Sequence, residues 1–151
     1  MDKFLVVIGC QEEKLERVNK KFKRDLLDFI NSNAHKYTGV ISIVRRDMRG
    51  SRNFNKSGDN LVTNNMVLLG YPSDDIIEVP GYVVDASKFR TDASYDLVGI
   101  STSASVLGVA MNMYSNGLNI SILKDYCTNR DNFDEKGTYN TINKYMPGCL
   151  K

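Results

Sequence analysis

The chain has 151 residues, of which 42% are hydrophobic and 25% are charged. This length and composition predict one globular domain, residues 1–151, with enough apolar side chains for a real core. The formal net charge of +2 is too small to favour nucleic acid or an anionic membrane surface as a partner.

The compartment is expected to be the cytoplasm. The apolar run "FLVVI" at residues 4–8 is too short for a signal sequence or a membrane span. The three cysteines Cys10, Cys127 and Cys149 are an odd number without the spacing of metal ligands, which suits a reducing environment. We therefore interpret them as buried structural thiols.

The first forty-odd residues have the pattern of a βαβ unit. Residues 4–8 predict a strand buried on both faces. Apolar residues then recur at three- and four-residue spacing over 12–33, which predicts an amphipathic helix with Glu12 and Glu13 at its positive end. The run "VISIV" at 40–44 predicts a second, parallel strand. His35 lies near the end of the helix and is expected to be exposed.

The rest of the chain continues the alternation. Residues 45–65 predict a long polar loop, and residues 75–84 a third strand interrupted by Pro80 and Gly81. Further strands are predicted at 95–100 and 118–123, and helices at 106–114 and 135–146. The order of elements indicates an α/β fold: a three-layer αβα domain with a mostly parallel sheet.

Three segments carry a resemblance to a known family. "VIGCQ" is similar to an opening motif V-[IV]-D-x-Q, and "VISIVRRDM" to a strand that ends in Arg-Asp. "GISTSASVLGVAMNMYSNGLNISILKDYC" is similar to G-[VI]-x-T-x-x-C-V…A…G…V-x-x-D-x-C. The residues in register with this third motif are Gly99, Thr102, Val106, Ala110, Gly117, Asp125 and Cys127. In these motifs the chain resembles the isochorismatase-like superfamily, the cysteine hydrolases that include nicotinamidases and isochorismatases.

The resemblance implies a catalytic Asp, Lys and Cys, and this chain departs from all three. Gly9 stands at the Asp position and Ser105 at the Cys position, and no lysine stands near Glu78 to Pro80. Lys88 lies too far along the chain to be assigned to this role. A serine needs a base to become a nucleophile, and Gly9 supplies none. The family's hydrolytic chemistry is therefore expected to be absent, with Ser105 as the substituted nucleophile of the alternative in which some hydrolysis survives.

No metal or other cofactor is predicted. Nicotinamidases of the family carry Asp-x-His for a divalent ion, but here Met48 and Arg49 follow Asp47. Without a neighbouring histidine, Asp47 lacks partners for a zinc-type site, and an ion pair with an adjacent arginine is the simpler interpretation. Cys10 should point away from the side that Gly9 faces, because residues alternate across a strand.

Two features remain as a possible binding site. Thr102 or Ser103 is a good helix N-cap, and with Ser101 they line a helix start whose N–H groups favour anions; plain capping is the alternative. The resemblance also implies a cis peptide bond between Ile100 and Ser101. Basic side chains follow the second strand, at the same sheet edge where parallel-sheet proteins bind ligands: Arg45, Arg46, Arg49 and Arg52.

The sequence thus predicts an isochorismatase-like protein, catalytically inactive or diverged, that binds a small anionic molecule, of which a nucleotide is one example. A hydrolase that uses Ser105 and a structural or assembly subunit remain alternatives. The family often forms oligomers, so a homo-oligomer is expected, with no membrane or nucleic-acid partner.

Overall fold

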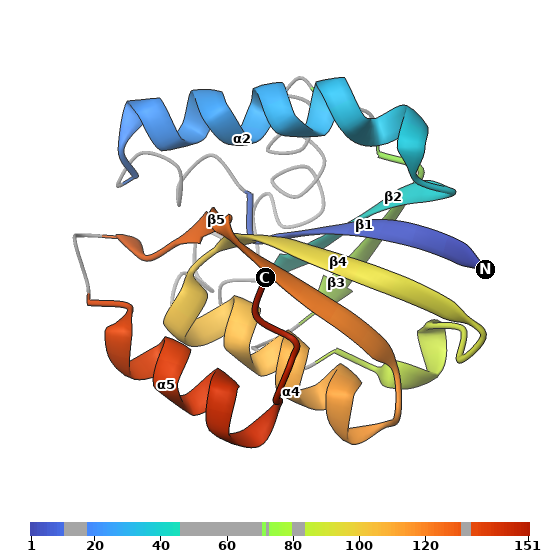
Figure 1. Ribbon diagram of the computed structural model, residues 1–151. Coiled ribbons are helices and arrows are strands. Elements are labelled where there is room, and N and C mark those ends of the chain that lie inside the picture. Colours follow the sequence, from blue (N-terminus) through green and yellow to red (C-terminus); the bar gives the residue numbers. More distant parts are fainter. Residues whose placement is uncertain (11–17, 46–70, 72, 80–83, 131–133) are drawn as a thin grey trace, which may run out of the picture.

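The computed structural model describes residues 1–10, 18–45, 71, 73–79, 84–130 and 134–151. Strands and helices alternate along the chain (Figure 1). In chain order they are β1 (Asp2–Ile8), α2 (Lys20–Asn33), η1 (Ala34–Lys36), β2 (Gly39–Arg45), β3 (Asp75–Val79), η2 (Ala86–Lys88), β4 (Ala93–Ile100), η3 (Thr102–Val106), α4 (Leu107–Ser115), β5 (Asn119–Thr128) and α5 (Lys136–Tyr145).

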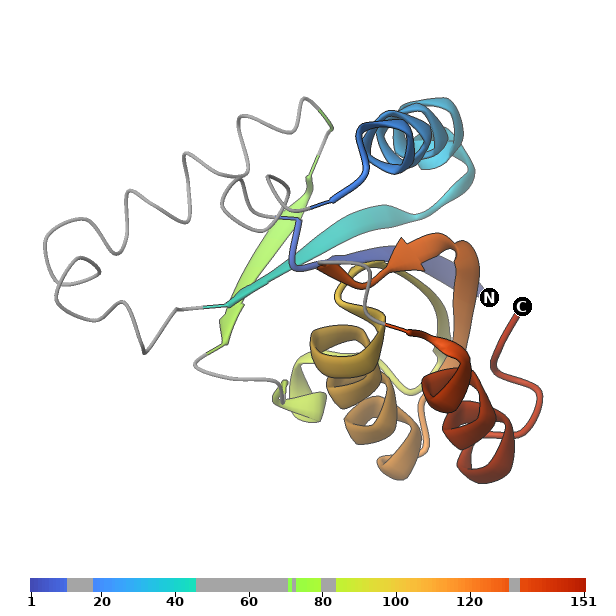
Figure 2. The same cartoon turned by 90° about the vertical axis from the view of Figure 1, so that its left-hand side faces the viewer.

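The five described strands form one sheet in the order β3-β2-β1-β4-β5, and every neighbouring pair is parallel. Helix α2 covers one face, and α4 and α5 lie together on the other (Figures 1 and 2). This arrangement confirms the predicted three-layer α/β class. It also explains why the central strands are continuous apolar runs, since both faces of the sheet are covered.

The core is divided by the sheet into two clusters. In β1, Leu5 and Val7 pack on the α2 side, whereas Val6 and Ile8 pack on the side of α4 and α5. This division follows from the alternation of side chains along a strand.

Helix α2 begins later in the described chain than the periodicity predicts. Its N-cap is Asn19, whose side-chain oxygen accepts hydrogen bonds from the N–H groups of Lys21 at 2.7 Å and Phe22 at 3.4 Å. Asparagine is among the best N-cap residues because it satisfies N–H groups that have no partner within the helix. The predicted residues at 12–17 lie outside the described part of the chain.

Strand β5 is longer than predicted and irregular. Leu97 of β4 pairs with Ile122, but Gly99 pairs with Cys127, so the four residues 123–126 lie opposite the single residue Val98. A bulge of this kind bends a strand and redirects its side chains. The sequence does not predict the second half of the strand, because its polar residues do not continue the apolar run.

The other bounds agree closely with prediction. The last helix, α5, matches the expected 135–146 to within a residue at each end. Strand β3 accounts for the first half of the expected 75–84, and residues 80–83 lie outside the described part. Residues 46–65 of the predicted loop also lie outside the described part of the chain. Within the described residues, no helix combines the length and the apolar character needed to cross a membrane.

Candidate functional site

The ends of three parallel strands meet at the carboxyl edge of the sheet. Ile8 of β1 lies beside Ile43 of β2 on one side and Gly99 of β4 on the other. The positions that the motifs single out, Gly9, Arg45 and Ser101, therefore leave the sheet at one edge. This is the edge at which open parallel sheets bind ligands.

Gly99 brings β4 into close contact with β1 at this edge. Its φ of +134° is a conformation that residues with a side chain rarely adopt. A Cβ atom at Gly99 would overlap the carbonyl oxygen of Ile8 and lie 2.8 Å from the Ile8 nitrogen and carbonyl carbon. Gly9 follows with φ +66°, and its N–H donates to the Ile43 carbonyl at 2.9 Å. The peptide bond between Ile100 and Ser101 is cis, as the resemblance implied.

The segment 99–105, from the end of β4 through most of η3, is here named the site turn. In η3, a wide π-helical turn, the Val106 N–H donates to the Ser101 carbonyl. Ser105 lies in this turn and is 6% exposed. Among the described residues, its hydroxyl has no hydrogen-bond partner, and Gly9 has no side chain that could take its proton. The described site thus holds a hydroxyl without a general base.

The hydroxyls of Thr102 and Ser103 bond across to other elements. Thr102 Oγ1 donates to Glu135 Oε1 at 2.7 Å. Ser103 Oγ shares a hydrogen bond with Thr138 Oγ1 and accepts another from Asn129 Nδ2 at 2.8 Å. The prediction that Thr102 or Ser103 caps the helix is therefore wrong, because the N-cap is Ser101 and both hydroxyls bond to distant side chains.

The N–H groups of the site turn are also partly used. The Ser103 N–H donates to Asn129 Oδ1 at 2.8 Å, and the Ala104 N–H donates to the Ser101 carbonyl at 3.1 Å. Of the four N–H groups at residues 102–105, at most two are left for a ligand. An anion bound here would depend on additional donors.

The predicted basic cluster is only partly described. Arg45 is the last residue of β2 and so lies at the carboxyl edge. Arg46, Arg49 and Arg52 lie outside the described residues, as does Asp47. Near the position implied for the family lysine, β3 carries Glu78, and Lys88 is an exposed residue of η2.

The cysteines are buried, as predicted. Cys10 belongs to the core on the α2 side, and its Sγ donates to the Ile8 carbonyl at 3.7 Å. Val106, next to Ser105, belongs to the core on the opposite face of the sheet. Burial raises the pKa of the Cys127 and Cys149 thiols, which disfavours the reactive thiolate.

The described part of the chain contains no set of metal ligands. Among those residues, no group of three or more His, Cys, Asp or Glu side chains is placed to hold a metal ion. His35 is exposed on η1, as predicted.

Sequence reasoning missed four residues that touch the site turn or its partners: Asn129, Glu135, Thr138 and Tyr139. Glu135 accepts a second hydrogen bond from the Tyr139 hydroxyl, at 3.0 Å. Burial and the nearby Glu135 carboxylate raise the pKa of Tyr139, so its hydroxyl stays a donor. The spacing of Glu135, Thr138 and Tyr139 places them on one helix face. This spacing is the signal in the sequence from which they could have been found.

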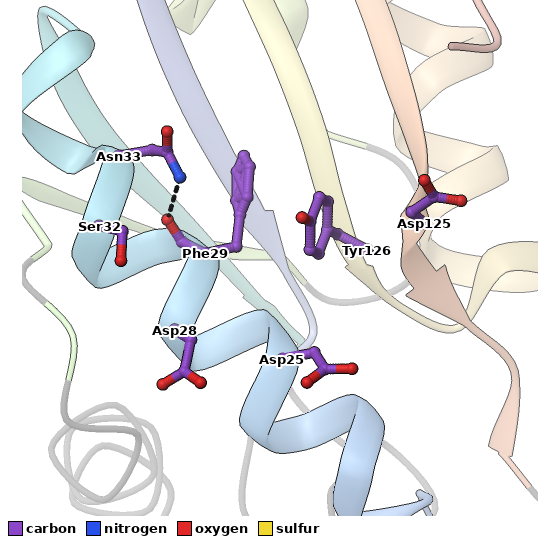
Figure 3. Close-up of a pocket in the computed structure, with 7 residues that line it drawn as sticks. All are labelled: Asp25, Asp28, Phe29, Ser32, Asn33, Asp125 and Tyr126. Atoms are coloured by element: carbon purple, nitrogen blue, oxygen red, sulfur yellow. Dashed lines mark hydrogen bonds between the residues drawn. The ribbon is translucent and has the colours of Figure 1, made fainter.

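A hollow lies on the α2 face of the sheet, between α2 and β5 (Figure 3). Its volume is about 420 Å³. Phe29 of α2 faces Tyr126 of β5 with ring centroids 4.0 Å apart. The polar lining of the hollow comes from Asp25, Asp28, Ser32, Asn33 and Asp125. Asp25 is paired with Lys21 at 2.7 Å.

Comparison with known proteins supports the fold. No family model and no curated protein matches the sequence. Among solved structures, pyrazinamidase of Pyrococcus horikoshii in complex with zinc is similar with a TM-score of 0.72 and 14% identity, over 100% of this chain and 98% of that one.

Two further structures are similar to the chain. N-carbamoylsarcosine amidase from Thermoplasma acidophilum has a TM-score of 0.68 and 16% identity, over 100% of this chain and 96% of that one. MAR1 ribonuclease from Caenorhabditis elegans has a TM-score of 0.69 and 14% identity, over 99% of this chain and 76% of that one. With its parallel sheet and covering helices, the chain has the isochorismatase-like α/β fold.

Proposed function

We propose that this chain is an isochorismatase-like protein that has lost the hydrolytic activity of its structural neighbours and binds a small anionic molecule at the carboxyl edge of the sheet. The observation behind the loss of activity is the pair Gly9 and Ser105. Ser105 is buried in the site turn without a hydrogen-bond partner among the described residues, and Gly9 offers no acid or base beside it.

The reactivity of a thiol placed at position 105 tests this loss directly. A free cysteine has a pKa of about 8.5, and only a nearby cation or base makes it a thiolate at neutral pH. We expect the Ser105→Cys variant to be alkylated by iodoacetamide no faster than free cysteine at pH 7, with half-maximal reactivity at or above about pH 8.5. Wild-type protein, whose three cysteines are buried, provides the background.

Turnover assays complete this test. Pyrazinamide and N-carbamoylsarcosine, the substrates that the names of two structural neighbours indicate, should not be hydrolysed by the wild type. A thiol with half-maximal reactivity well below pH 7, or hydrolysis that disappears in Ser105→Ala, would contradict the proposal and favour the alternative of a serine hydrolase.

The anionic ligand is inferred from the charge at this edge. Strand β2 ends at Arg45, and the segment that follows contributes Arg46, Arg49 and Arg52 in sequence. Arginine forms charge-assisted, often bidentate bonds to phosphate and carboxylate. Because at most two N–H groups of residues 102–105 are left for a ligand, the arginines would supply most of the affinity, with Ser101 as a further donor.

Thermal-shift and calorimetric titration with inorganic phosphate, nucleotides and small dicarboxylates test the binding. We expect a stabilised wild type, weaker stabilisation in Arg45→Ala and Arg49→Ala, and loss of the effect at high salt. Arg24→Ala is the matched control, because Arg24 is an exposed arginine on α2. If no anion stabilises the wild type, or if all three variants respond alike, the binding proposal is wrong.

The third alternative, a structural or assembly subunit, predicts neither turnover nor ligand response. A homo-oligomer is proposed for any of the three functions. Native mass spectrometry of the full chain, purified from its own host, measures the oligomeric state and reveals a small molecule that is carried through purification.

A further inference from the structure

Side chains from the residue after β5 and from the start of α5 hold the site turn through a set of hydrogen bonds, here named the α5 joint. It consists of Thr102 and Ser103 on one side and Asn129, Glu135 and Thr138 on the other. Thr102, Asn129 and Thr138 are all buried. In Figures 1 and 2 the start of α5 lies beside the segment that leads from β4 into α4.

Asn129 contributes the capping group that the helix lacks. The first N–H groups of a helix have no partner within it, and the N-cap residue Ser101 makes no side-chain bond to them. Asn129 instead accepts from the Ser103 N–H and donates to Ser103 Oγ, both at 2.8 Å. The cap is therefore supplied by the residue that follows β5, 26 residues away in sequence.

Glu135 contributes a second contact next to the first. Its Oε1 accepts from the buried Thr102 hydroxyl, while its Oε2 is held by Tyr139 from the next turn of the same helix. A buried hydroxyl or N–H that loses its only partner is costly. Without the joint, a rearrangement of the turn toward water or other acceptors would lower its free energy. Such a rearrangement would move the neighbouring Ser101 and Ser105.

We propose that Asn129 and Glu135 are positioning residues that keep the site turn in its wide π-helical form and so set the place of Ser101 and Ser105. That Ser101 and Ser105 face a ligand rests on the proposed function, whereas the control of the turn by the joint does not. The coupling is reciprocal: whatever stabilises the turn also stabilises the packing of α5.

Hydrogen exchange measured by mass spectrometry on the full chain tests the proposal. In Asn129→Ala and Glu135→Ala, we expect amides of residues 101–107 to exchange about tenfold faster, the effect of losing one buried hydrogen bond. Amides of α2 and β1 should be unchanged. Glu135→Gln keeps an acceptor for Thr102 and should restore slow exchange. If Asn129→Ala does not fold, Asn129→Asp keeps the acceptor for the Ser103 N–H and removes only the donor to Ser103 Oγ.

Two control variants separate positioning from general stability. Thr141→Ala removes a bond from Thr141 Oγ1 to the Gly137 carbonyl within α5, and Tyr139→Phe removes a bond to Glu135 that does not touch the turn. Neither should accelerate exchange at 101–107 as much as Glu135→Ala does. Equal acceleration across α2, β1 and the turn, or an effect of Thr141→Ala as large as that of Glu135→Ala, would overturn the proposal.

A second readout uses the thiol of the Ser105→Cys variant. Adding Asn129→Ala should change its alkylation rate by about tenfold, whereas adding Thr141→Ala should leave it unchanged. The absolute reactivity of this thiol tests the proposed loss of hydrolysis. The difference between joint and control variants tests the positioning role, so the two failures are distinguishable, and equal rates in both double variants would refute positioning.

Discussion

Replacing Gly99 with alanine should be among the most damaging single changes in the protein. The new Cβ would overlap the Ile8 carbonyl oxygen and lie 2.8 Å from two further backbone atoms of that residue. Backbone atoms cannot turn aside as a flexible side chain can. Strand β1 would have to move away from β4, which opens the centre of the sheet and displaces the site turn.

The cost has two parts. Alanine at a φ of +134° takes a conformation that costs about 1–3 kcal/mol. Forcing extra volume into a packed interior costs about 1–3 kcal/mol more. We therefore expect a loss of about 2–6 kcal/mol, near the upper end because the neighbours are backbone, against a typical total stability of about 5–15 kcal/mol. For a chain of this size, at about 2–4 °C per kcal/mol, the melting temperature should fall by about 10–20 °C.

Two other glycines provide matched controls in urea and thermal unfolding. Gly117 has φ +78°, and a Cβ added there would have no other atom within 4 Å, so Gly117→Ala isolates the conformational cost of about 1–2 kcal/mol. Gly137 lies in α5, also with open space, and Gly137→Ala should stabilise the chain by about 0.5–1 kcal/mol. If Gly99→Ala is no worse than Gly117→Ala, the close approach of β1 and β4 is not as described and the reasoning fails.

Three further predictions concern buried polar groups. Asp96→Ala should cost about 1–3 kcal/mol in urea unfolding, because it leaves the Tyr37 hydroxyl, now 2.7 Å from Asp96 Oδ2, without its acceptor; an unchanged midpoint would count against this bond. Burial raises the pKa of Tyr71 above the ordinary 10.0, so the unfolded chain releases its proton first and stability should fall as pH rises past about 10. Tyr71→Phe should flatten that fall, and an equally steep one would show that Tyr71 does not cause it. Native protein should resist iodoacetamide at Cys127 at pH 8, whereas urea-unfolded protein should react; peptide mapping that finds rapid native labelling would contradict its burial.

Local patterns in the sequence determined the elements and their order. The apolar runs at 4–8 and 40–44 predict strands β1 and β2 because a strand buried on both faces needs apolar side chains in succession. Periodicity located the helices, and the alternation of elements predicted the parallel, three-layer arrangement. The motif around Gly99 and Thr102 placed the turn at the carboxyl edge, where it is found.

Tertiary structure alone decided what the side chains of that turn do. A short hydroxyl can cap its own helix, bind a ligand or bond to another element, and the choice depends on which groups packing brings within about 3 Å. For Thr102 and Ser103 those groups stand 26 to 35 residues away, on the residue after β5 and at the start of α5. The bulge in β5 is likewise invisible locally, since it exists only relative to β4. Periodicity records which face a residue occupies, whereas hydrogen-bond partners are set by contacts between distant segments.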